Sequence, residues 1–121
     1  MRTYSKNSIT IKNKERWDLM GFFRKRAHNH SRDSIFYGDR KLFAKSLMLL
    51  WYKQRGRCAY TGVKLYGDTN THLDHIVPRT KGGSSEIGNL QFVCALVNRM
   101  KFNLSHEEFI ETCKVITKNN E

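Results

Sequence analysis

The run Leu73-Asp74-His75-Ile76-Val77 limits what this chain can fold into, because it sets an acid and an imidazole inside an apolar segment. A short apolar run of this kind is typical of a buried strand. Pro78 closes the run, since proline has no backbone N–H to give to a strand ladder. Consecutive residues on a strand point to opposite faces. We therefore expect the strand to end near Asp74 and His75, so that both side chains reach one cleft.

The net charge of +11 over 121 residues points to a polyanionic partner, with nucleic acid ahead of a membrane surface. The length is that of about one domain. Residues 1–57 hold 15 of the 22 Lys and Arg residues but only 4 of the 11 acids, so the excess charge lies in the first half. A basic half that serves only solubility is the alternative, and it explains the segregation poorly.

Three cysteines at irregular spacing do not suggest a secreted disulfide framework. No apolar run approaches the roughly 20 residues that a membrane span requires. We therefore expect a soluble protein in a reducing, cytoplasmic setting, with no membrane partner.

In the first half, residues 1–12 are polar and predict a loose arm. Apolar residues at three- and four-residue steps then predict an amphipathic helix from Lys14 that frays within residues 28–33. A second helix is predicted from Arg40 to Arg55, with Asp39 as its N-cap and Gly56 as its stop.

In the second half, residues 57–66 predict a small hairpin around the turn at Thr61 and Gly62. After the apolar run, residues 79–88 form a Gly/Ser-rich loop, and residues 89–101 are interpreted as a helix. A last helix begins at the capping box of Ser105 and Glu108. Because a two-stranded hairpin is marginal alone, it must pack on a helix, and we expect an α+β fold.

Four polar residues are candidates for a metal-dependent hydrolytic site. Asp74 offers a hard oxygen that suits Mg²⁺ or Mn²⁺, and His75, with a reference pKa near 6.5, can take a proton from water. Asn89 and Asn98 are nine residues apart, on opposite sides of the predicted helix. Asn89 is therefore expected to cap the helix and tie down the loop, and Asn98 to turn its oxygen towards Asp74.

The stretch "LDHIVPRTKGGSSEIGNLQFVCALVNRMK", residues 73–101, resembles the core motif of the HNH endonuclease family, which has a ββα-metal (His-Me finger) fold. The shared features are an Asp-His pair on a strand, a proline, a Gly-Gly loop, Asn-Leu-Gln, and Asn-x-x-Lys on a helix. The resemblance covers residues 57 to about 104. It implies an HNH nuclease domain over 57–121, preceded by a basic, mainly helical nucleic-acid-binding extension over 1–56.

The resemblance also implies roles for the four candidates. Asp74 and Asn98 would bind one divalent ion, Mg²⁺ or Mn²⁺, and His75 would be the general base. Asn89 would be the structural asparagine, which makes this the His-Asn-Asn variant. The implied reaction is hydrolysis of DNA phosphodiester bonds, as a nick or a double-strand cut, leaving 5′-phosphate and 3′-hydroxyl ends.

The sequence departs from the family at a second metal site. Many relatives carry two CxxC pairs that bind a structural zinc, whereas here Thr61 and Val97 stand where the partners of Cys58 and Cys94 would be. A tetrahedral zinc site needs four ligands. We therefore expect no structural zinc, and Cys58 and Cys94 as small core residues.

Basic residues near the motif are candidates for contacts to double-stranded DNA, although solvated surface charge explains any single one equally well. They are Arg24, Lys25, Arg26, Arg79, Lys81, Arg99 and Lys101. Trp17, Phe22 and Phe23 are interpreted as core rather than as base-stacking residues.

A homodimer is possible. Rival interpretations are a non-catalytic nucleic-acid-binding module on an HNH scaffold and a zinc-finger-like domain. The choice among homing, restriction and phage DNA-processing roles stays open.

Overall fold

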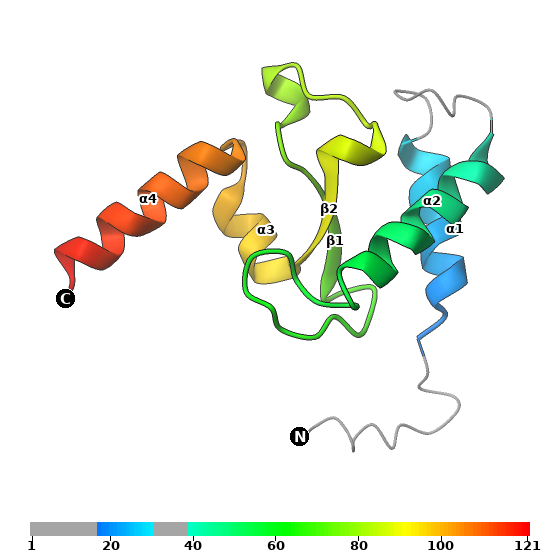
Figure 1. Cartoon of the computed structure of the whole chain (residues 1–121), viewed down its shortest axis with the longest axis horizontal. Coiled ribbons are helices and arrows are strands. Elements are labelled where there is room, and N and C mark those ends of the chain that lie inside the picture. The colour runs from blue at the N-terminus through cyan, green and yellow to red at the C-terminus, as the bar shows by residue number, and fades with distance from the viewer. Residues whose placement is uncertain (1–16, 31–38) are drawn as a thin grey trace.

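The computed structural model describes residues 17–30 and 39–121, which contain four α-helices and one two-stranded sheet (Figure 1). The predicted α+β class is confirmed. The predicted arm over 1–12 and the predicted helix start at Lys14 lie outside the described residues. The elements in chain order are α1 (Leu19–His30), α2 (Arg40–Lys53), β1 (Thr71–His75), the 3₁₀ turns η3 (Arg79–Lys81) and η4 (Ile87–Asn89), β2 (Leu90–Cys94), α3 (Ala95–Lys101) and α4 (His106–Asn119).

Aspartates begin both N-terminal helices. The Asp18 side chain accepts a hydrogen bond of 2.9 Å from the backbone N–H of Gly21, at the start of α1. Asp39 accepts one of 3.0 Å from the N–H of Leu42, which confirms the predicted N-cap of α2. The helix ends at Lys53, two residues before the predicted end, and Gly56 follows with a φ of +65° that favours glycine.

The sheet differs from the predicted hairpin. Strands β1 and β2 pair antiparallel, with Asp74 opposite Gln91 and His75 opposite Leu90. The predicted helix over 89–101 is therefore wrong in its first half, because Leu90–Cys94 is a strand and α3 begins only at Ala95. The predicted hairpin over 57–66 is present only as an isolated antiparallel bridge between Arg57 and Lys64, with a backbone hydrogen bond of 2.8 Å from the N–H of Cys58 to the carbonyl of Val63. Aromatic and β-branched residues such as Phe92 and Val93 suit a pleated, half-buried surface.

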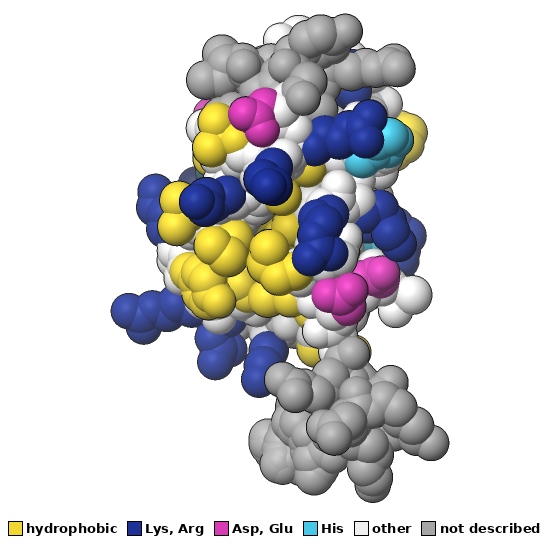
Figure 2. All heavy atoms as spheres, turned by 90° about the vertical axis from the view of Figure 1, so that its right-hand side faces the viewer, with side chains coloured by type: hydrophobic (Ala, Val, Ile, Leu, Met, Phe, Trp, Pro, Cys, Tyr) yellow, Lys and Arg dark blue, Asp and Glu magenta, His cyan; other side chains and the backbone are white. Residues whose placement is uncertain are grey.

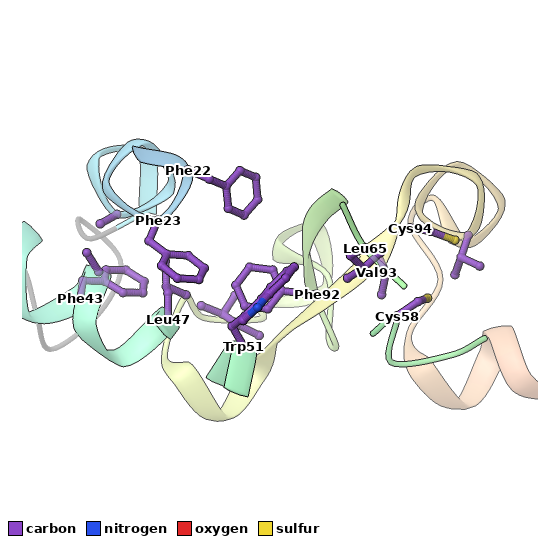
Figure 3. Close-up of a cluster of buried hydrophobic side chains, with 14 of the residues drawn as sticks. Phe22, Phe23, Phe43, Leu47, Trp51, Cys58, Leu65, Phe92, Val93 and Cys94 are labelled. Carbon is purple, nitrogen blue, oxygen red and sulfur yellow. The ribbon is translucent and has the colours of Figure 1, made fainter. Parts of the chain in front are cut away.

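The core joins the N-terminal helices to the sheet (Figure 3). The ring centroid of Phe92 on β2 lies 5.3 Å from that of Trp51, 5.9 Å from that of Phe23 and 6.0 Å from that of Phe22. Phe22 and Phe23 are thus buried, as the core interpretation expected. Residues on both sides of the proposed boundary at residue 57 share this core, and the boundary itself stays a prediction.

Gln54, just after α2, holds the edge of β2. Its side-chain oxygen accepts from the N–H of Phe92 at 2.9 Å, and its side-chain nitrogen donates to the carbonyl of Phe92 at 2.9 Å. These are the bonds that a neighbouring strand would make. A side chain from the α2 terminus therefore fixes β2, and through β2 the strand that carries Asp74 and His75.

Candidate active site

Asp74, His75 and Asn98 line one cavity of about 230 Å³, although they come from two elements. Strand β1 ends at His75 and the chain turns towards Pro78. The two adjacent side chains reach the same cavity at this strand end. Asn98 lies on α3, the helix that follows β2 directly. Arg79 and Phe102 form part of the cavity rim.

The carboxylate of Asp74 is 6% exposed and is held by two side chains. Gln91, its cross-strand partner, donates a hydrogen bond of 2.9 Å to Oδ2. Lys101 Nζ lies 3.2 Å from Oδ2 and 3.3 Å from Oδ1. A buried carboxylate needs such compensation, because an unpaired buried charge is costly.

Lys101 is fully buried, although the sequence interpretation placed it at the surface as a DNA contact. Besides Asp74, its ammonium donates to the carbonyl of His75 at 2.9 Å and to that of Ile76 at 3.3 Å. The Lys101 side chain therefore connects the last turn of α3 to the end of β1. The surface position predicted for Lys101 is wrong, because its charge is satisfied inside the protein.

The imidazole of His75 lies between two partners that the sequence did not indicate. Its Nε2 is 3.0 Å from the hydroxyl oxygen of Ser85, which is fully buried. The ring of His30, the last residue of α1, lies edge-on to it with 5.5 Å between centroids. The Ser85 contact fixes the orientation of the ring. The His30 contact brings the basic N-terminal part of the chain to the site.

Asn98 is oriented by His72. The amide nitrogen of Asn98 lies 3.1 Å from His72 Nδ1, which suits a neutral ring that accepts a hydrogen bond there. Burial lowers the pKa of His72, and the nearby Arg26 and Arg99 lower it further. The neutral His72 ring therefore accepts a hydrogen bond from the amide nitrogen of Asn98. The amide oxygen of Asn98 can then serve as a ligand for a cation.

Asn89 ties down the Gly/Ser-rich loop, as predicted, but it does not cap a helix. It ends η4 and precedes β2, so the argument that placed Asn89 and Asn98 on one helix is wrong. Its side chain accepts from the N–H of Val77 at 2.9 Å and donates to the carbonyls of Val77 at 3.0 Å and Ser84 at 2.7 Å. These three bonds join both ends of the loop. The role of Asn89 as the family's structural asparagine stays a prediction, and these bonds are compatible with it.

The remaining candidate DNA contacts lie near the surface. Arg24, Lys25, Arg79, Lys81 and Arg99 are exposed. Half-buried Arg26 lies over the ring of Phe22, 4.7 Å from its centroid. Two of the lysines have acidic neighbours, since Lys25 is 3.8 Å from Asp68 and Lys81 is 3.5 Å from Glu108.

Cys58 and Cys94 are buried free thiols in the part of the core shown in Figure 3. Burial raises the pKa of Cys58, but hydrogen bonds from Thr61 and nearby backbone groups outweigh it, and the net shift is downward. Within the described ranges, no three His, Cys, Asp or Glu side chains are grouped as metal ligands. The expectation of no structural zinc stays a prediction.

Tyr60 connects the site to α4. Its hydroxyl lies 2.9 Å from His106 Nδ1, and the two rings stack. Burial raises the pKa of Tyr60, a hydrogen bond with Gln91 opposes this rise, and the charge of Asp74 adds to it. Nothing local in the sequence marks Tyr60, His30 or Ser85 as neighbours of the site. His72 had a local signal, because it stands two residues before Asp74 on β1 and can face the same side of the strand.

A two-stranded antiparallel sheet followed directly by a helix, with an Asp-His pair at the strand end and an asparagine on the helix, defines the ββα class of nuclease-like domains. Residues 56–103 match the model of the HNH endonuclease family, less than half of the chain. This match, together with the ββα arrangement, indicates an HNH-type domain in this part of the chain and a nuclease-like function that involves nucleic acid. No curated protein and no solved structure gives a significant match. None of the described helices has the length and apolar character to cross a bilayer.

Proposed function

We propose that the chain is a metal-dependent endonuclease that hydrolyses phosphodiester bonds in double-stranded DNA and leaves 5′-phosphate and 3′-hydroxyl ends. The observation that carries the proposal is the meeting of Asp74, His75 and Asn98 at one cavity. A carboxylate, an imidazole and a carboxamide are the groups that such hydrolysis uses. The HNH match supports the same reaction class.

The donor set fits one hard divalent cation, Mg²⁺ or Mn²⁺. Asp74 supplies carboxylate oxygen and Asn98 supplies amide oxygen, and both types suit these ions. Lys101 and Gln91 hold the carboxylate in place, while His72 takes the amide nitrogen of Asn98. Bound there, the cation would neutralise negative charge on the phosphate and on the departing 3′ oxygen.

His75 acts as the general base. Its imidazole takes a proton from the attacking water, and the contact of Nε2 with the Ser85 hydroxyl holds the ring in place. The water oxygen forms a bond to phosphorus in line with the 3′ oxygen, whose bond to phosphorus breaks. The phosphate stays on the 5′ side, and the 3′ oxygen takes up a proton to become a hydroxyl.

The basic residues hold the DNA backbone. Arg26 from α1 and Arg99 from α3 lie close enough to His72 to affect its pKa, so cations from both halves of the chain flank the site. The face that carries α1 and α2 shows Lys and Arg side chains around an apolar patch (Figure 2). Such contacts to phosphate give binding that weakens with salt and does not depend on sequence.

Cleavage of a supercoiled plasmid in Mg²⁺ or Mn²⁺ tests the proposal. The wild-type protein should nick or linearise the plasmid, and His75→Ala should lower the rate by about 10²–10⁴-fold. His28→Ala, which removes an exposed histidine on α1, should cleave like wild type. If the wild type binds the plasmid without cutting it, the non-catalytic module replaces the nuclease. If His75→Ala cuts as well as the wild type, His75 is not the general base.

A further inference from the structure

Helix α4 extends away from the rest of the molecule towards the C-terminal end (Figure 1). Its first turn is attached, since the Phe109 ring packs edge-on against Tyr60 with 5.1 Å between centroids. Phe109 is the buried residue of the helix. After that turn the side chains are half-buried or exposed. A helix of 14 residues is marginal in water without packing of an apolar face.

One side of α4 carries a stripe of side chains that the described structure covers only in part. Ile110, Cys113 and Thr117 recur at three- and four-residue steps and, together with the charged side chains of Lys114, Lys118 and Glu121, line a shallow hollow. Ile110 is half-buried, and Cys113 is half-buried against the core. Ile116 lies beside this stripe and is 56% exposed. The stripe therefore offers a surface for another helix.

The charge of α4 argues against nucleic acid as the occupant. The helix carries Glu107, Glu108 and Glu111 against Lys114 and Lys118, a net charge of −1, while the whole chain carries +11. A phosphate backbone is attracted by clustered cations, which this helix lacks. A protein surface with charges of both signs suits this stripe better than nucleic acid does.

The order of these charges along α4 indicates that the protein surface which binds it is α4 of a second copy of the chain. Glu107, Glu111, Lys114 and Lys118 follow one flank of the stripe at steps of four, three and four residues, so they share one face. In an antiparallel pair related by a two-fold axis, positions equidistant from the centre meet. Glu107 then lies opposite Lys118, and Glu111 lies opposite Lys114.

We propose that α4 is a dimerisation helix, which pairs antiparallel with α4 of a second copy through the stripe of Ile110, Cys113 and Thr117. Glu108 lies on another side of the helix, bonded to Ser105 and near Lys81, and does not take part. Two helices about 21 Å long bury less than a standard interface, so the dimer dissociates on dilution. One consequence rests on the proposed function: a dimer delivers one nuclease site to each DNA strand.

Charge reversal on the full chain tests the pairing, measured by sedimentation velocity up to about 1 mM protein. Wild type should form dimers at high concentration. Glu107→Lys with Glu111→Lys makes the flank positive, Lys114→Glu with Lys118→Glu makes it negative, and each double variant should stay monomeric. An equal mixture of the two should dimerise again, and so should the variant that carries all four changes.

The matched control is Lys41→Glu with Lys45→Glu, two exposed lysines on α2 at the same four-residue spacing. It should dimerise like wild type. Circular dichroism checks that each variant keeps its helices. A wild type that stays monomeric over the whole range, or double variants that dimerise like wild type, would overturn the proposal. Neither outcome depends on DNA cleavage, so failure of the dimer is distinguishable from failure of the nuclease function.

Cross-linking gives a second readout of the same geometry. Cys113 lies half a residue from the proposed two-fold axis, whereas Cys58 and Cys94 are buried. A short bis-maleimide should link two wild-type chains and should not link Cys113→Ser chains. Absence of linked wild-type dimers at concentrations where sedimentation shows association would refute the antiparallel pairing.

Discussion

The region of β1, β2 and α3 and the helix α4 carry the same kinds of charged residue in opposite environments. Lys101 and Asp74 are buried against each other, and the lysine also satisfies two backbone carbonyls. Along α4, Glu111 and Lys114 lie exposed. A buried charge depends on the few partners that the fold holds around it, whereas an exposed charge exchanges partners with water. Charge therefore fixes the geometry of the site, while on α4 it is available to select a partner.

Replacing one lysine in each region should give the largest difference in stability between two variants. Lys101→Met leaves the Asp74 carboxylate buried without its cation, and we expect a loss of about 3–5 kcal/mol in the free energy of unfolding. Lys114→Met removes an exposed charge and should change this free energy by no more than about 0.5 kcal/mol. Urea denaturation followed by tryptophan fluorescence measures both.

A second change distinguishes charge from packing. Adding Asp74→Asn to the Lys101→Met chain removes the uncompensated charge, so part of the lost stability should return. If Lys101→Met costs no more than Lys114→Met, the two regions do not differ in the way described.

Substitutions at Gly83 and Gly88 compare a crowded with an open position of the backbone near the site. A Cβ on Gly83 would lie 1.7 Å from the carbonyl oxygen of Val77 and 2.9 Å from Asn89 Nδ2. Gly83→Ala must therefore displace the bonds between Val77 and Asn89, and we expect a cost of about 1–3 kcal/mol. Gly88→Ala meets no atom within 4 Å and should leave the melting temperature nearly unchanged. Equal melting temperatures for the two variants would contradict the close approach at Gly83.

Signals within a few residues of each other predicted the helix starts well. Asp39 caps α2, and Ser105 with Glu108 forms the capping box of α4. The local pattern predicts helix over the strand Leu90–Cys94, because a short valine-rich run suits either structure. Pairing with Thr71–His75, a segment about 19 residues earlier, decides the outcome, and the local pattern does not contain that information.

The same limit applies to the site. The motif was enough to single out Asp74, His75 and Asn98, which the structure gathers at one cavity. It did not show that Lys101 is buried, nor that His30 lies against His75 from 45 positions away. Those contacts depend on how α1 and α3 pack on the sheet. Tertiary packing thus supplied the supporting residues, and local sequence supplied the residues for which we propose the reaction.

Variants of Ser85 and Ser84 distinguish the hydroxyl that contacts His75 from a neighbouring hydroxyl on the same loop. Ser85→Ala removes the hydroxyl that holds His75 Nε2, and we expect kcat for DNA cleavage to fall by about tenfold to a hundredfold, since misplacing a reacting group has this cost. KM should change little, because Ser85 is buried away from DNA. Ser84→Ala should leave both constants near wild type. A fall in kcat that is equal in the two variants would show that the loop as a whole, rather than the Ser85 hydroxyl, is what matters.

The smallest effect is expected on α4, from the pH dependence of its capping box. The hydrogen bond from the Ser105 backbone N–H lowers the pKa of Glu108 below its ordinary 4.5, and nearby Lys81 lowers it further. A carboxyl whose pKa is lower in the folded chain stabilises the fold above the unfolded pKa, and this contribution is lost as the pH falls through the folded value. Thermal melts of the wild type should therefore show a small loss of stability on acidification below 4.5 that Glu108→Gln lacks, while the exposed Glu107→Gln should follow the wild type. If Glu108→Gln and wild type lose stability in parallel, the capping carboxylate adds no stability to α4, and the helix depends on Phe109 and a partner surface.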